Sequence, residues 1–169
     1  MLKKILFICI IILALVGWIY ASNPNALKIS LTTAKNSHDK VILNLYISNR
    51  STEPVDIYQY SKSLEPVLGY YLNFDIYHKE EKLELSYDKA RVKFPFKNDF
   101  ITLNPNDTYT ERIEISNYYN LKGSKEDEPW AEGEYMIICS YEYKYEGTKY
   151  GANLWEGTVI SDTLRLVVK

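Results

Sequence analysis

The sequence has few of the residues and none of the short motifs that mark common catalytic sites. It has 2 His and 2 Cys among 169 residues, and only 7 Gly and 6 Pro. It contains no Gly-x-Ser-x-Gly and no glycine-rich phosphate loop. Internal repeats and low-complexity tracts are absent as well. Because of these absences, the sequence does not support a prediction of a nucleophile-elbow hydrolase or of a nucleotide-binding protein.

The two cysteines do not predict a disulfide. Cys9 lies in an apolar N-terminal run and Cys139 in a strongly patterned strand, so one of them would sit in or beyond a membrane. A body of 148 residues is also large enough to fold without a cross-link. We therefore expect Cys139 to be a buried, small apolar residue and not a nucleophile, which would need an exposed and activated thiol.

The two histidines do not suggest a metal site. His38 lies in a polar turn, and His78 ends a strand ahead of Lys79. Neither has a neighbour at the spacing of zinc ligands. We expect both side chains to be solvated, and we expect the protein to need no metal or other cofactor.

The charge distribution argues against a nucleic-acid partner. The formal net charge is −2, and without Lys3 and Lys4 it becomes −4, with no basic stripe to bind phosphates. The acidic run Glu126-Asp127-Glu128 lacks the alternating spacing of calcium loops, so a solvated loop is favoured, although calcium binding stays open. A hydrolase that uses paired carboxylates also stays open, because their separation is not visible in a sequence.

The N-terminus predicts export. Lys3 and Lys4 precede an apolar run from Ile5 to Tyr20, which we expect to form a hydrophobic helix, and Ala21 follows it. A positive start, an apolar middle and a small final residue are typical of signal peptides. The length of this run lies between that of the hydrophobic part of a signal peptide and that of a full membrane span. Residues 1–21 are therefore either a cleaved signal peptide or a retained membrane anchor. In both cases residues 22–169 form one domain outside the cytoplasmic membrane, periplasmic or extracellular.

The body alternates between apolar and polar residues, which predicts strands. Its 16 tyrosines favour strands as well. We expect seven to nine strands, one turn of helix over Asn117–Leu121, and an all-β fold: a single antiparallel β-sandwich. The predicted strands are 27–32, 40–49, 55–60, 70–78, 82–86, 90–96, 109–115, 133–145 and 163–168.

The longest of these strands alternates over its whole length. Residues 100–103 lead into the turn signal Asn104–Asp107. Residues 147–156 form the connection after the long strand. The side chains expected to share one face of the long strand are Tyr135, Ile137, Cys139, Tyr141, Tyr143 and Tyr145, and we expect the start of this strand to be covered on both faces.

The later strands carry a spaced pattern of apolar and small residues. It comprises Leu103, Pro105, Ile113, Ile115, Ser116, Tyr119, Leu121, Gly133, Tyr135, Ile137, Trp155, Gly157, Ser161, Leu164 and Leu166. This pattern resembles the late strands of bacterial immunoglobulin-like domains. It is also similar to the intracellular proteinase-inhibitor family of bacteria and to the N-terminal domains of deuterolysin-type secreted proteases. The resemblance covers about residues 100–168 and implies an immunoglobulin-like β-sandwich, but no inhibitor-loop residues carry over.

Tyr135 has a physical role in this resemblance. A tyrosine that opens a long strand can turn its ring into the corner and hydrogen-bond the preceding connection, as in tyrosine corners. The sequence departs from true immunoglobulin domains, because it has no second body cysteine and no tryptophan in an early strand.

Aromatic residues around the last connection are the candidate binding site. Tyrosine and tryptophan give rigid contact area and recur at protein-binding hot spots. The predicted function is an exported, non-enzymatic module that binds another envelope or secreted protein; an inhibitor or an immunity protein is one form of it. A structural or accessory envelope protein without a discrete site is the alternative. The predicted binding residues are Tyr143, Tyr145, Tyr150 and Trp155, beside Tyr141. The competing interpretation is that Tyr141, Tyr143 and Trp155 cover the open end of the sandwich.

Overall fold

The structure is a computed structural model. It describes residues 25–37, 40–59, 71–85, 100–120, 130–143 and 154–169. The predicted N-terminal segment 1–21, the predicted strand 90–96, the acidic run 126–128, His38, Tyr145 and Tyr150 lie outside these residues.

The described residues form an all-β protein, as the alternation predicts. They contain twelve strands and one 3₁₀ turn, Ile115–Asn117. This is more than the seven to nine strands expected, because three pairs of adjacent residues (in β5, β6 and β9) also form short ladders. The strands are β1 (Leu27–Ser37), β2 (Lys40–Asn49), β3 (Val55–Tyr58), β4 (Leu72–His78), β5 (Glu81–Lys82), β6 (Glu84–Leu85), β7 (Phe100–Leu103), β8 (Thr108–Glu114), β9 (Tyr119–Asn120), β10 (Gly133–Tyr143), β11 (Gly157–Ile160) and β12 (Leu164–Val168).

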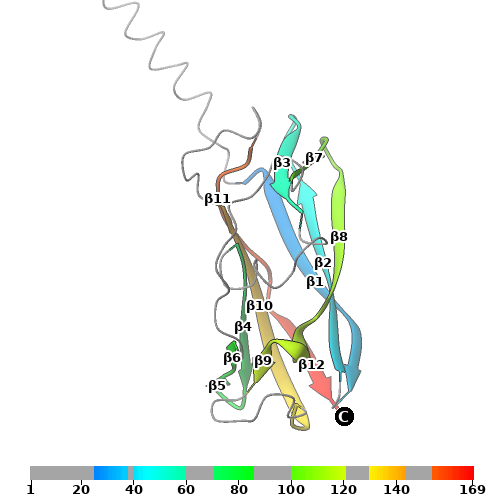
Figure 1. Cartoon of the computed structure of the whole chain (residues 1–169), viewed down its shortest axis with the longest axis vertical. Helices are drawn as coiled ribbons and strands as arrows, with labels where there is room; N and C mark the ends of the chain where they lie inside the picture. Colours follow the sequence, from blue (N-terminus) through cyan, green and yellow to red (C-terminus); the bar gives the residue numbers. More distant parts are fainter. Residues whose placement is uncertain (1–24, 38–39, 60–70, 86–99, 121–129, 144–153) are drawn as a thin grey trace, which may run out of the picture.

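The strands are arranged in two larger sheets and two small pairs. One sheet has the order β1-β2-β8, and the other has the order β11-β10-β4-β5, with β12 also on β10. β3 pairs with β7, and β6 pairs with β9. All these ladders are antiparallel, and the two larger sheets lie as two layers along the long axis (Figure 1).

β10 is the central strand of the larger sheet. One edge pairs with β4, and the other is shared between β12 at its start and β11 at its end. Ser161 lies where the chain passes from β11 to β12. Its backbone N–H donates to the Cys139 carbonyl at 2.8 Å, and its Oγ accepts from the Cys139 N–H at 2.9 Å. A side chain thus completes the ladder at the point where the backbone leaves it.

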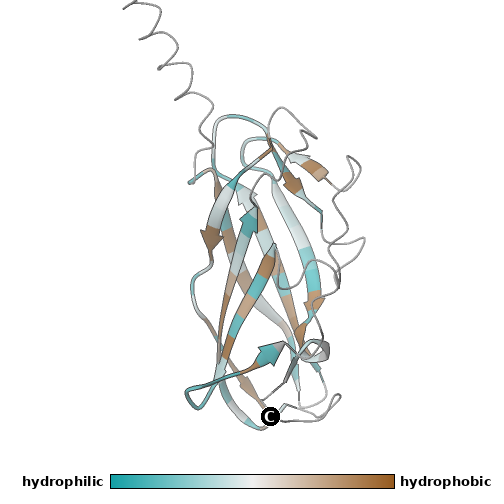
Figure 2. Ribbon diagram, turned by 60° about the vertical axis from the view of Figure 1, so that its left-hand side comes forward, coloured by the Kyte–Doolittle hydropathy of each residue, from teal (hydrophilic) through white to brown (hydrophobic). Residues whose placement is uncertain are grey.

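Alternation decides which side chains form the core. Along β4 and β10 every second residue is buried, and the strands change between hydrophobic and hydrophilic along their length (Figure 2). The buried residues of both larger sheets belong to one cluster. Each fully buried Ile, Leu or Val in it contributes about 1.5–3 kcal/mol relative to exposure.

Three local predictions need correction. Asn117–Leu121 is not a helical turn: the turn lies earlier, at Ile115–Asn117, and Tyr119 is in β9, because its buried ring packs on Phe74 with centroids 6.1 Å apart. The predicted strand 82–86 is two short strands on either side of buried Leu83. β11 was not predicted.

Candidate functional site

Four aromatic rings form a closed circuit in the half of the molecule that holds β3 and β7. The rings belong to Tyr58 at the end of β3, Tyr71 just before β4, Phe100 at the start of β7 and Tyr143 at the end of β10. We call these four residues the aromatic ring cluster. Its centroid distances are 5.5 Å (Tyr58–Tyr71), 5.3 Å (Tyr71–Tyr143), 5.9 Å (Tyr143–Phe100) and 5.7 Å (Phe100–Tyr58).

The geometry of these contacts favours a rigid cluster. Both contacts of Phe100 are edge-to-face, at 86° and 87°, and the two of Tyr71 are tilted by about 30°. The edge-to-face contacts bring the positive edge of one ring to the negative face of another, and aromatic pairs contribute about 0.5–1.5 kcal/mol beyond burial. Side chains spread between Tyr58 and Tyr143 in the sequence are therefore joined.

A second pair of rings extends the cluster into the core. Trp155 stacks on Tyr141 with centroids 5.3 Å apart and planes inclined by 19°. The Tyr141 hydroxyl accepts from the backbone N–H of Tyr58 at 3.3 Å, and the backbone N–H of Trp155 donates to the Asp56 carbonyl at 3.0 Å. β3 is thus bonded both to β10 and to the chain that precedes β11. The Trp155 Nε1–H is the one buried side-chain polar atom without a hydrogen-bond partner among the described residues.

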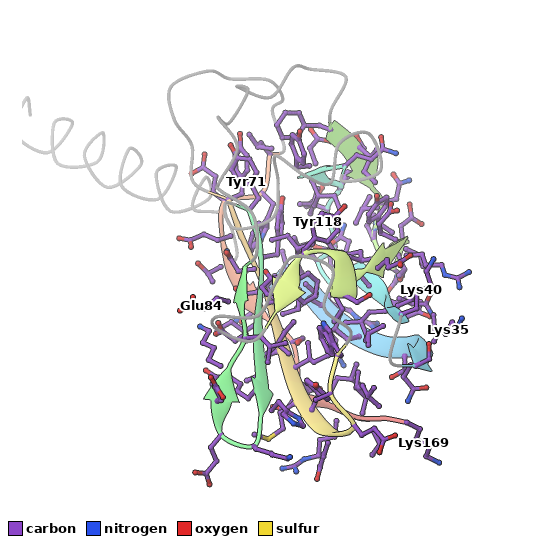
Figure 3. The ribbon with its side chains drawn as sticks, turned by 60° about the horizontal axis from the view of Figure 1, so that its bottom comes forward. Lys35, Lys40, Tyr71, Glu84, Tyr118 and Lys169 are labelled. Atoms are coloured by element: carbon purple, nitrogen blue, oxygen red, sulfur yellow. The ribbon has the colours of Figure 1, made fainter. Side chains whose placement is uncertain are left out.

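Two of the predicted binding residues are buried. Tyr143 is 4% exposed and Trp155 is 2% exposed. Both belong to the hydrophobic core cluster. Tyr71 and Phe100, which were not predicted as site residues, are half-buried (Figure 3 labels Tyr71).

The cluster marks the points where three chain segments meet the described residues. Tyr58 lies just before segment 60–70 and Tyr71 directly after it, and Phe100 directly follows segment 86–99. Tyr143 directly precedes segment 144–153, which contains Tyr145 and Tyr150. The predicted binding tyrosines that remain are therefore two and seven residues along the chain from a buried member of the cluster.

The opposite end of the larger sheet is closed by a different stack. The Tyr135 ring lies between His78, with centroids 4.4 Å apart, and Trp130, with centroids 4.7 Å apart. The Tyr135 hydroxyl donates to the Ala131 carbonyl at 3.0 Å, which confirms the predicted hydrogen bond from this tyrosine to the preceding connection. The Trp130 Nε1–H donates to the Tyr119 carbonyl at 2.8 Å.

His78 is not the solvated residue that the sequence suggested. It is 5% exposed, stacks on Tyr135, and its Nδ1 is 3.2 Å from the Glu134 carbonyl oxygen. The signal was present in the sequence, because the alternation that turns Leu72, Phe74 and Ile76 inward turns His78 inward too.

The reactive groups of the described residues are held in inert settings. Cys139 is a free, fully buried thiol, as predicted, and burial raises its pKa well above the usual 9.0. Among residues that the structure describes, no group of three or more His, Cys, Asp or Glu side chains could hold a metal ion. Within the same residues there is no helix long and apolar enough to cross a membrane.

Comparison with known proteins adds no assignment. No protein-family model matches this chain, and no curated protein matches it.

Proposed function

We propose that the protein is an exported, non-enzymatic module that binds another protein of the cell envelope, on an immunoglobulin-like β-sandwich. Its body lies outside the cytoplasmic membrane, and it works without a cofactor. An inhibitor or an immunity protein is one form that such a module takes. Binding residues often lie on loops that a rigid scaffold positions.

The observation that carries this proposal is the aromatic ring cluster. It couples β3, β4, β7 and β10 where segments 60–70, 86–99 and 144–153 join them. Because mutually packed rings hold the strand ends, the connecting segments start from fixed points. Fixed starting points reduce the ordering entropy that a loop loses on binding, which favours affinity.

The contact residues in the proposal are Tyr145 and Tyr150. Both are in segment 144–153, which leaves β10 after Tyr143 and returns ahead of Trp155. Tyrosine is enriched at binding hot spots, because its large ring is rigid and carries a hydroxyl. In the proposal, buried Tyr143 and Trp155 support the segment, and Tyr145 and Tyr150 between them make the contact.

The test is affinity capture from the protein's own envelope, followed by mass spectrometry. Tyr145→Ala together with Tyr150→Ala should weaken capture roughly thirty-fold, equivalent to a hot-spot loss of about 2 kcal/mol, without a change in melting temperature. Tyr46→Ala is the matched control, since Tyr46 is half-buried on β2 in the other sheet. Equal recovery of the partner by all variants would rule out this surface, and no cross-linked partner at all would favour a structural envelope protein.

A further inference from the structure

The described chain enters the fold at the end that holds β3 and β7. The Ala26 carbonyl accepts from the Arg50 N–H at 2.6 Å, and Leu27 is the register partner of Asn49. Asn49 in turn donates through Nδ2 to the Leu103 carbonyl at the end of β7, at 2.9 Å. The start of β1 and the turns beside β3 and β7 therefore share one end of the molecule (Figure 1).

The other end is far away. β1 runs to Ser37, and eleven residues of strand extend over about 35 Å. There the Asn36 side chain donates to the Val167 carbonyl at 2.6 Å, close to the C-terminal residue Lys169. Figure 3 shows Lys35, Lys40 and Lys169 on the opposite side of the molecule from Tyr71.

The link to the predicted hydrophobic run is short. Residues 21–25 separate Tyr20, the last residue of the run, from Ala26, which is already buried. Five residues span at most about 18 Å even when fully extended. If the run stays in the bilayer, the end of the domain with β3 and β7 cannot move further away than this.

We propose that residues 1–21 are retained as an anchor and that the end bearing the aromatic ring cluster faces the membrane. This rests on the proposed function and specifies its partner: a membrane protein whose contact surface stands within about 20 Å of the bilayer. Among the described residues, the exposed turn residues at this end are polar: Arg50, Thr52, Glu53, Asn104, Asn106 and Asp107. They suit the hydrated headgroup region and not the hydrocarbon core, so these turns stand at the membrane surface without entering it.

Energy transfer from the domain to labelled lipid tests the orientation. The full chain is reconstituted in vesicles of phosphatidylcholine and phosphatidylglycerol that carry an acceptor-labelled lipid. A donor dye is attached to Thr52→Cys in one preparation and to Lys35→Cys in the other, each with Cys9→Ser. Both positions are exposed, and the burial of Cys139 protects the remaining thiol.

The Thr52 site should transfer energy to the lipid more efficiently than the Lys35 site, because about 35 Å of strand separates the two ends. Equal transfer, or more from Lys35, would overturn the orientation. The mass of the protein purified from cell membranes should include residues 1–21, and a mass that begins after Ala21 would overturn the anchor. Neither measurement depends on Tyr145 or Tyr150. A result that contradicts the anchor or the orientation can therefore be distinguished from one that contradicts the proposed binding surface.

Discussion

Gly133 lies against the His78 ring and leaves no room for a side chain of its own. Gly133 has φ +140°, which side chains rarely adopt, and a Cβ at this position would lie 2.7 Å from His78 Cε1. Only glycine allows the imidazole to lie flat on Tyr135 beside the start of β10. The buried position of the His78 ring therefore requires a glycine at position 133.

Gly133→Ala should lower the free energy of unfolding by about 2–4 kcal/mol, from backbone strain and from displacement of the His78 ring. His78→Ala removes the clashing atom, so the double variant should lose about 1–2 kcal/mol less than the sum of the two single variants. Urea unfolding of the four proteins measures this coupling. Strict additivity would show that the ring and the glycine do not touch.

Two buried acidic groups make stability depend on alkaline pH. Burial raises the pKa of Cys139 well above 9.0, and burial also raises that of Tyr135 from 10.0, against the opposing hydrogen bond to Ala131. In the unfolded chain both groups lose their protons at lower pH than in the fold. Their contribution to the free energy of unfolding is therefore complete below about pH 9, and it is lost as the pH rises further.

The free energy of unfolding should fall above about pH 9, by up to about 1.4 kcal/mol per pH unit for Cys139. Chemical denaturation between about pH 8 and 10 gives the slope. Cys139→Ala should flatten it in this range, because alanine has no proton to lose. A slope that is the same in both proteins would contradict this origin.

Asn49 organises the junction between β2, the following turn and β7. It is fully buried, and its Nδ2 donates to the carbonyls of Glu53 at 2.8 Å and Leu103 at 2.9 Å. Its Oδ1 accepts from the Ser51 N–H at 2.9 Å and from the Ser51 hydroxyl at 2.7 Å. One amide thus satisfies the backbone groups that the turn leaves open.

Asn49→Ala should cost about 2–4 kcal/mol, because it removes the buried amide that bonds the Leu103 carbonyl and the Ser51 N–H, while the Glu53 carbonyl keeps only its bond from the Ser51 hydroxyl at 2.8 Å. Asn44→Ala, on the surface of the same strand, should change stability by no more than about 0.5 kcal/mol. Thermal or urea unfolding compares the two variants. Similar losses at both positions would show that the buried amide network adds nothing.

How far each strand could be predicted depends on how fully it alternates. β2 was predicted with its bounds, Lys40–Asn49, because apolar residues alternate over its whole length. β11 was missed because Gly157 and Thr158 give it no apolar face, and pairing with β10 makes it a strand.

The candidate site was harder to predict than the strands. The aromatic ring cluster joins four elements from distant parts of the sequence, which no local pattern reveals. Tyr143 could have been placed in the core, because it continues the inward series of β10.

The two ends of the whole molecule differ in what they offer. One end gathers the start of β1 together with β3 and β7; the other carries the end of β1, the start of β2 and the C-terminus (Figure 1). A protein fused after Lys169 should therefore leave partner capture unchanged, which pull-down with the fused chain measures. If the fusion abolishes capture, the contact surface is at the C-terminal end of the domain instead.

Hydrogen exchange of the full chain, with and without its captured partner, tests most directly which part of the domain binds. Binding should slow amide exchange in segment 144–153 and leave the end of β1, the start of β2 and β12 unchanged. Slower exchange at the end of β1 or along β12, with segment 144–153 unaffected, would contradict the account.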